Sequence, residues 1–220
     1  MKKKIEISKR NTFLYSETFW ILFITIFFTV GIVGIALPEF RKYLLPLSSF
    51  HLLLTFLVLY VSRQGKKDKF LLFTFLVFVI GILVEAIGVN TSLLFGYYTY
   101  GQVLGYKIFG VPLIIGVNWA TMVVVSSTLT YRLNITLFWK VFLAASIMTG
   151  LDFLIEPVAI KLGYWTWQDG QIPLYNYFCW FAISVPMHYF YMKWNLAENN
   201  SVPKAVFVLL AIFFLVLNFV

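Results

Sequence analysis

Long apolar runs alternate with short polar segments along the chain, and this pattern predicts the secondary structure. A helix that crosses the roughly 30 Å hydrocarbon core of a bilayer needs about 20 mostly apolar residues. Seven runs of about this length occur, bounded by charges, Pro, Gly or Asn. They cover residues 19–37, 44–61, 70–89, 109–131, 136–158, 174–192 and 203–220. We therefore predict an all-α, polytopic integral membrane bundle of about seven transmembrane helices.

The same runs argue against other fold classes and against a second domain. They are apolar on all sides and too long for the strands of a membrane barrel, while an open sheet would leave backbone groups unpaired in lipid. We predict a basic N-terminal segment at residues 1–18 and a single seven-helix domain at residues 19–220. A basic start before an apolar run also resembles a secretory signal, but a run of about 19 residues favours a helix that is retained.

Composition supports the membrane interpretation. Of the 220 residues, 61% are hydrophobic and only 12% are charged, and the mean hydropathy is +0.87. This excludes a soluble protein, because a water-facing surface needs about twice that share of charged residues. The net charge of +8 does not indicate nucleic-acid binding, since the basic residues lie in short loops and tails. Thirteen of them fall on the side of the N-terminus and four on the other, which predicts a multi-pass protein of the plasma membrane with a cytoplasmic N-terminus and an external C-terminus.

Two connections on the predicted outer side, residues 90–108 and 159–173, are rich in Tyr, Trp and Gly and poor in charge. One interpretation is an aromatic belt at the level of the lipid headgroups. The other is a lid over a pocket, because turn-forming glycines accompany the aromatic residues in both loops. The sequence leaves both interpretations open.

Three carboxyl groups lie within predicted spans: Glu85, Asp152 and Glu156. Ionisable groups are costly inside a membrane and usually have a function. At 1.5 Å per residue they lie roughly 6, 9 and 3 Å beneath the outer boundary, in one layer. Asp152 and Glu156 are four residues apart on one helix face, so they cannot both ionise cheaply, and such a pair provides a general acid and a general base. The alternative is that Glu156 and Pro157 end the helix at the interface, with the carboxylate in water.

Two further polar residues are predicted to reach the layer of acids. His51 lies roughly 10 Å deep and Asn118 roughly 13 Å deep in their predicted helices. Either side chain can orient a water molecule or a carboxylate, although single polar residues of this kind are more often structural partners between helices. The sequence contains no glycine-rich phosphate loop, HExxH, CxxC or Gly-x-Ser-x-Gly motif, so we expect no cofactor and no metal. An apolar substrate fits the composition best.

A series of short motifs spans residues 81–181. It consists of Glu85, Gly96-Tyr97-Tyr98-Thr99-Tyr100, Leu104-Gly105, Gly110-Val111-Pro112-Leu113, Asn118-Trp119, Asp152-x-x-x-Glu156-Pro157, Gly163-Tyr164-Trp165-x-Trp167, Ile172-Pro173, Asn176 and Trp180. Their order and spacing resemble the integral membrane carotenoid biosynthesis family of carotenoid 1,2-hydratases, which includes the bacterial γ-carotene and lycopene hydratases and the archaeal bisanhydrobacterioruberin hydratase. The resemblance implies a cofactor-independent hydro-lyase that adds water across the terminal C=C bond of a linear carotenoid end group, giving a tertiary alcohol.

The residues themselves suit this chemistry. Protonating a trisubstituted alkene needs a strong, dry acid, for which we favour Asp152, and the attacking water needs a base, either Glu156 or Glu85. Aromatic faces stabilise the tertiary cation between these two steps. The candidates for binding the substrate are Tyr97, Tyr98, Tyr100, Asn118, Trp119, Trp165, Trp167, Asn176, Trp180 and His51.

The expected partners are a lipophilic carotenoid (lycopene, γ-carotene or a related compound), membrane lipid and other enzymes of the carotenoid pathway, but no nucleic acid. Two other functions remain open. A lycopene-type cyclase begins with the same protonation, but an internal double bond traps the cation in place of water. A non-enzymatic transporter of a lipophilic small molecule also fits seven helices with acids in the membrane, although the sequence lacks the broken helices that this class favours.

Overall fold

The computed structural model describes residues 16–168 and 170–220, and most of them are helical. The helices are α2 (Glu17–Ala36), α3 (Pro38–Leu44), η1 (Leu45–Leu47), α4 (Ser48–Val61), α5 (Lys67–Thr91), α6 (Ile114–Thr130), α7 (Leu137–Lys161), α8 (Leu174–Lys193) and α9 (Val202–Asn218). The strands are β1 (Tyr98–Tyr100), β2 (Lys107–Ile108), β3 (Val111–Pro112) and β4 (Trp165–Trp167). Each of the seven predicted runs overlaps one of these helices. Of the predicted basic segment at residues 1–18, residues 1–15 lie outside the described residues.

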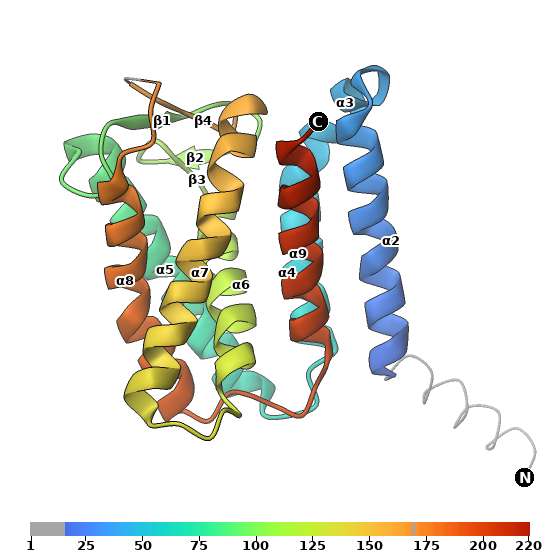
Figure 1. Cartoon of the computed structure of the whole chain (residues 1–220), viewed down its shortest axis with the longest axis vertical. Coiled ribbons are helices and arrows are strands. Elements are labelled where there is room, and N and C mark those ends of the chain that lie inside the picture. Colours follow the sequence, from blue (N-terminus) through green and yellow to red (C-terminus); the bar gives the residue numbers. More distant parts are fainter. Residues whose placement is uncertain (1–15, 169) are drawn as a thin grey trace, which may run out of the picture.

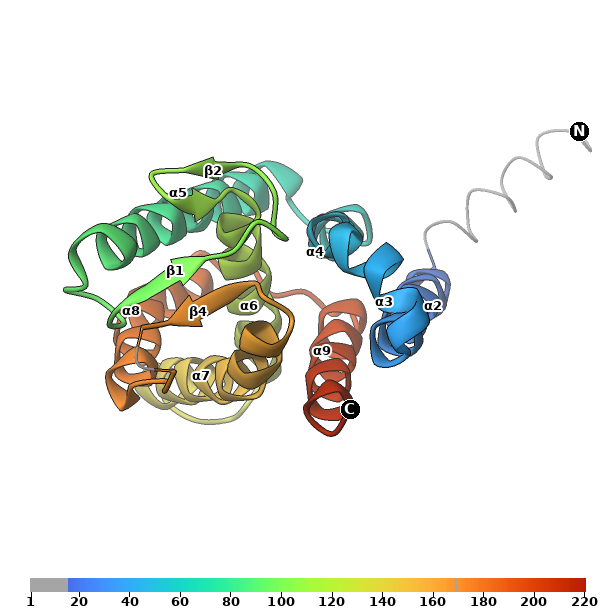
Figure 2. The same ribbon diagram turned by 90° about the horizontal axis from the view of Figure 1, so that it is seen from above.

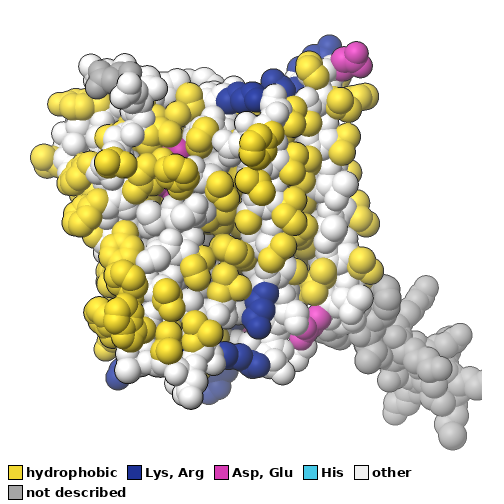
Figure 3. Space-filling view, viewed as in Figure 1, with side chains coloured by type: hydrophobic (Ala, Val, Ile, Leu, Met, Phe, Trp, Pro, Cys, Tyr) yellow, Lys and Arg dark blue, Asp and Glu magenta, His cyan; other side chains and the backbone are white. Residues whose placement is uncertain are grey.

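The helices form an apolar bundle that suits a membrane. Four helical segments of the described chain are long and apolar enough to cross a bilayer: α2, the α3–α4 segment Pro38–Val61, α5 and α7. The helices α6 and α9 are also apolar but shorter. Hydrophobic side chains cover the middle of the molecule, while Lys and Arg gather toward its two ends (Figure 3). The all-α membrane bundle predicted from the sequence is therefore confirmed.

The bundle consists of two groups of helices. Helices α5, α6, α7 and α8 form one group, and α2, α4 and α9 stand beside it (Figures 1 and 2). The loops after α4 and α8 meet at one end, where Arg63 forms an ion pair with Glu198 at 2.7 Å and Asn200 donates a hydrogen bond to the carbonyl of Ser62. Helix α2 begins at this end and the C-terminus lies at the other (Figure 1). Which end faces the cytoplasm stays a prediction.

A sharp corner after α2 turns the chain back toward the bundle. Pro38 stands at the start of α3, where a missing backbone N–H has no cost. Gly34 lets Leu44 approach so closely that a Cβ at residue 34 would lie 2.6 Å from its Cγ. Arg41 Nε donates to the carbonyl of Ile35 at 2.7 Å, satisfying one of the free carbonyls at the end of α2. This corner brings α4 alongside α2.

The start of α6 differs from the prediction and moves one candidate residue. The helix begins at Ile114, not at residue 109, because the β2–β3 hairpin occupies the preceding residues. Phe109 and Gly110, which connect the two strands, have positive φ angles of 52° and 83° that no helix accepts. Asn118 therefore lies about 6 Å from the start of its helix, whereas the predicted start would have placed it about 13 Å along.

Two other helix boundaries affect the predicted site. Helix α4 begins at Ser48, four residues later than predicted, so His51 lies in its first turn. Helix α7 continues through Pro157 as far as Lys161. The interpretation in which Glu156 ends the helix with its carboxylate in water is thus wrong, because the side chain is buried inside the bundle.

The two aromatic loops pair with each other across the end of the four-helix group. Strands β1 and β4 are antiparallel, with Tyr98 opposite Trp167 and Tyr100 opposite Trp165. The backbone N–H of Gly101 extends the pairing by donating to the carbonyl of Tyr164 at 2.8 Å. We call this strand pair the lid, because it lies over the ends of α5 to α8 (Figures 1 and 2).

Gly101 should be essential for closing the lid. A Cβ at this position would lie 2.1 Å from the carbonyl oxygen of Gly163, a backbone atom that cannot move without separating the strands. We expect Gly101→Ala to destabilise the lid by about 1–3 kcal/mol, seen as faster amide hydrogen exchange in β1 and β4. Gly150→Ala is the matched control, because a Cβ there meets nothing within 4 Å. Equal exchange rates in the two variants would contradict the role of Gly101.

Candidate active site

The lid directs a row of aromatic side chains toward the helices. Successive side chains of a strand point to opposite faces, so alternate residues share a face. Thr99 and Thr166 form the outward pair, with their hydroxyl oxygens 3.3 Å apart. The inward side chains are Tyr98, Tyr100, Trp165 and Trp167.

Glu85 of α5 lies beneath the lid and accepts three hydrogen bonds. The phenols of Tyr98 and Tyr100 both donate to Oε2, Tyr100 at 2.8 Å. The indole Nε1 of Trp119 donates to Oε1 at 2.9 Å. Burial, with the neighbouring Glu85 carboxyl, raises the pKa of Tyr98 and of Tyr100 well above the usual value, so both phenols keep their protons and act as donors.

A glycine in α5 allows Trp119 to reach Glu85. A Cβ on Gly81, one turn before Glu85, would lie 2.8 Å from Cγ of Trp119. Small residues let membrane helices approach closely in this way. On its other side Trp119 stacks against Trp180 of α8, with ring centroids 4.0 Å apart and planes inclined by 2°. The indole is therefore held from two directions, and it positions Glu85.

Glu156 of α7 is held by the other strand of the lid. The indoles of Trp165 and Trp167 both donate to Oε2 at 2.9 Å. The side-chain amide of Asn176, from α8, donates to Oε1 at 3.1 Å. Like Glu85, this carboxyl accepts three hydrogen bonds, and it is only 2% exposed.

Asp152 lies one turn before Glu156 and has far fewer partners. Its carboxyl receives a single hydrogen bond from the described residues, from the same Asn176 amide at 3.3 Å, although the residue is only 1% exposed. No described residue forms an ion pair with Asp152, Glu156 or Glu85. Three buried acids therefore share one site without a countercharge from the described chain, and Asp152 is the one whose lone pairs are least satisfied.

The acids surround a small cavity of about 20 Å³, lined by polar and aromatic side chains, which has room for about one water molecule. A second cavity of about 200 Å³ lies beside it, between α2, α4 and α9 on one side and α6 and α7 on the other. Its wall is mostly apolar. The two cavities have four lining residues in common, which we call the shared wall: Ile115, Asn118, Ile155 and Trp165.

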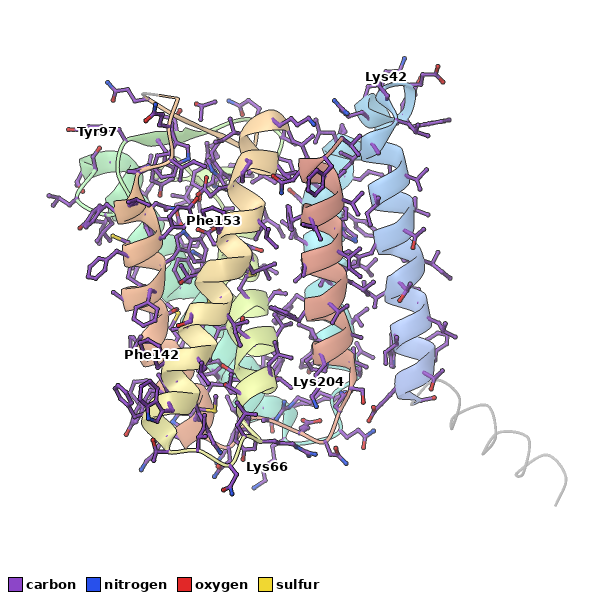
Figure 4. All side chains as sticks on the ribbon, viewed as in Figure 1. Lys42, Lys66, Tyr97, Phe142, Phe153 and Lys204 are labelled. Atoms are coloured by element: carbon purple, nitrogen blue, oxygen red, sulfur yellow. The ribbon has the colours of Figure 1, made fainter. Side chains whose placement is uncertain are left out.

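The structure brings together most of the predicted site residues but separates two. Tyr97 is 64% exposed and lies at the outer edge of the molecule (Figure 4). His51 lines the apolar cavity, where its ring packs edge-on against Phe28 at 4.5 Å. Asn118 stands in the shared wall, and its amide has no hydrogen-bond partner in residues 16–168 and 170–220, so it is free to bind water. The other predicted residues line the acid cavity or support it.

Sequence reasoning missed three lining residues. Ile155 follows Asp152 by three residues and lies on the same face of α7, so helical spacing would have identified it. Ile115 could be identified only with the correct start of α6 at Ile114. Phe95 is buried with a φ of 65°, a conformation that a sequence does not reveal for a residue other than Gly. Within the described residues, no group of three or more His, Cys, Asp or Glu side chains is arranged to hold a metal ion.

Comparison with known proteins gives one match. A family model described as carotenoid biosynthesis protein matches residues 47–220, which include the lid, all three acids and the shared wall. No curated protein and no solved structure matches the chain.

Proposed function

The chain belongs to the carotenoid biosynthesis protein family, and from this premise we propose that it hydrates a linear carotenoid. Water is added across the terminal C=C bond of the end group, giving a tertiary alcohol, without a cofactor. The substrate is lycopene, γ-carotene or a related compound dissolved in the plasma membrane, which the protein crosses several times with the lid on the outer side.

The observation that carries this proposal is the unequal bonding of the three acids. Glu85 and Glu156 each accept three hydrogen bonds, which suits an ionised carboxylate. Within the described residues Asp152 receives one, from the Asn176 amide that also donates to Glu156. Two charges so close together in a dry site repel each other, and the proton is best held by the group with the fewest donors. Asp152 is therefore the acid.

The reaction follows from this arrangement. Asp152 transfers its proton to the CH carbon of the terminal double bond, whose π electrons form the new C–H bond and leave the charge on the tertiary carbon. The oxygen of a water molecule then bonds to that carbon and loses a proton to the Glu156 carboxylate. Return of this proton to Asp152, which shares the Asn176 amide with Glu156, restores the starting state. Glu85 positions the lid, and its negative charge stabilises the carbocation.

The small cavity beside the acids favours hydration over cyclisation. A cyclase must exclude water from the cation, whereas this cavity has room for about one water molecule beside the acids. Asn118 offers a free amide to that water from the shared wall. A transporter would not need one acid left short of hydrogen bonds while the other two each accept three.

Expression in a lycopene-producing host, with mass analysis of the pigments, tests the proposal. We expect products heavier than lycopene by the mass of one or two water molecules. Cyclic products of unchanged mass would establish the cyclase instead. An unaltered pigment, with the protein present in the membrane, would contradict any enzymatic role.

Trp180 is the best placed side chain to test stabilisation of the cation. It lines the acid cavity, and among the tryptophans that do so in the described chain it alone donates to none of the acids. A desolvated aromatic face is worth about 2 kcal/mol to a cation. We expect Trp180→Phe to keep most of the turnover and Trp180→Leu to lose about 30-fold, measured as product per inserted protein.

The same pair of substitutions at Trp139 provides the control. This residue of α7 is 51% exposed on the apolar surface, so Phe and Leu should be tolerated equally there. Equal effects of Phe and Leu at Trp180 would remove its ring from the mechanism.

A further inference from the structure

We infer that the carotenoid enters sideways from the bilayer, between α2 and α4, and lies in the apolar cavity with its reacting end at the shared wall. This inference rests on the proposed function and adds where the substrate binds and how it arrives. Helix α2, which forms one side of the cavity, lies outside the matched residues 47–220. The acids therefore come from the matched part of the chain, whereas part of the binding site comes from α2, which precedes it.

The sizes of the two cavities indicate that water occupies one and the carotenoid the other. The acid cavity, at about 20 Å³, holds about one water molecule and has no room for an isoprenoid end group as well. The neighbouring cavity is about ten times larger. The alkene must therefore approach from the apolar side, and it meets the acids at the shared wall, which lines both cavities.

The shape and lining of the larger cavity suit a linear hydrocarbon chain. Aromatic and aliphatic side chains from α2, α4 and α9 form most of its surface, including Phe28 and Phe213. Along α4 the lining extends from Ser48 to Thr55, a distance of about 10 Å at the helical rise. A carotenoid comparable in length to the roughly 30 Å bilayer core exceeds this, so most of the molecule must remain outside.

The opening of the cavity faces lipid. Three of its lining residues are also strongly exposed, Val30 of α2, Leu47 of η1 and Phe50 of α4, at 52%, 51% and 56%. They mark a mouth between α2 and the start of α4. On the side of the lid, a hydrogen bond at 2.7 Å between Ser48 Oγ and the Tyr164 hydroxyl joins α4 to the loop that carries β4. The substrate is thus admitted from the membrane and not from water.

This arrangement predicts that one end of the carotenoid reacts in each binding event. The remainder of the chain extends through the mouth into the bilayer. A symmetric carotenoid has to leave and return to react at its second end. The singly hydrated carotenoid should therefore accumulate before the doubly hydrated one.

Filling the cavity separates binding from chemistry. A Cβ on Gly31 would lie 3.1 Å from the outer edge of the Phe213 ring, so Gly31→Leu places its side chain in the cavity. Gly150→Leu is the matched control, a helical glycine with nothing within 4 Å. Both are made in the full chain, alone and with Asp152→Asn, in a lycopene-producing host. Pigment per purified protein, read from its visible absorption, measures binding, and hydroxylated product measures turnover.

We expect Gly31→Leu to reduce bound lycopene about tenfold or more, with or without Asp152→Asn, and Gly150→Leu to leave it unchanged. Hydration with undiminished pigment in Gly31→Leu would overturn the cavity while the proposed function stands. Pigment lost from Gly31→Leu, without hydroxylated product from the unmodified chain, would leave the cavity supported and overturn the function.

A reversible closure of the mouth covers the case in which Gly31→Leu does not fold. Val30→Cys and Phe50→Cys, on the two sides of the mouth, are combined in one variant and joined by a bis-maleimide that a reductant cleaves. We expect the cross-linked protein to take up no added lycopene and the cleaved protein to regain uptake, with Val30→Cys alone and Phe50→Cys alone unaffected by the same treatment. Uptake by the cross-linked protein would place the access route elsewhere.

Discussion

Replacing Asp152 with Asn should lower hydration by about 10²- to 10⁴-fold, the usual contribution of a general acid. Asn has the same shape and accepts a hydrogen bond from the Asn176 amide as Asp152 does, but it has no proton to give to an alkene. Folding should survive, because the carboxyl has only one hydrogen bond from the described residues. The measurement is product per inserted protein, with pigment binding as a second readout that should not change.

Asp68→Asn is the matched control for this substitution. Asp68 lies exposed in the first turn of α5, at the end of the bundle far from the lid, and its variant should hydrate lycopene normally. If Asp152→Asn kept normal turnover, the acid would have to be another residue. If instead it lost both pigment and inserted protein, the carboxyl would have a structural role.

Replacing Glu156 with Gln should abolish the alcohol to a similar extent, about 10²- to 10⁴-fold, yet leave the first step intact. A Gln side chain can still accept hydrogen bonds from Trp165 and Trp167 through its amide oxygen, but it cannot take a proton from water. The cation that Asp152 generates then returns the proton and reforms the alkene. In D₂O, we expect deuterium to enter the end group of the carotenoid without a gain of hydroxyl.

This isotope exchange separates the two acids, because Asp152→Asn should show neither deuterium nor alcohol. Glu85→Gln is the comparison for position, since Glu85 also accepts three hydrogen bonds but faces the β1 strand of the lid. It should retain some hydration while weakening the lid. Equal loss of alcohol in Glu85→Gln, with deuterium exchange preserved, would make Glu85 the base and contradict the assignment to Glu156.

The helices could be predicted closely because a membrane imposes their length and composition. A chain in lipid must satisfy its backbone groups within each segment, so an apolar run of sufficient length has little alternative to a helix. Errors occurred where this constraint ends. The apolar residues 109–113 predict a start of α6 five residues too early, because the hairpin before Ile114 satisfies its backbone groups by strand pairing and not by a helix.

The layer of acids could also be predicted, because the helical rise converts position in a span into depth. The i, i+4 spacing of Asp152 and Glu156 placed both on one face of α7, and both are buried there. The partners of each acid could not be predicted. Tyr97 and Tyr98 are identical neighbours in the sequence, which does not show which of them points inward. Only the register of β1 against β4 turns Tyr98 inward and leaves Tyr97 exposed.

The sequence by itself determined the all-α membrane fold, the family resemblance and the set of acids, since these depend on composition, order and local periodicity. Only the tertiary structure decided which acid is left short of hydrogen bonds, that two loops 65 residues apart pair into one lid, and that an apolar cavity adjoins the acids. These features depend on distances between segments remote in the chain. Such distances arise from packing. Gly81 and Gly101 allow neighbouring segments to approach closely, and the sequence does not show which segments these are.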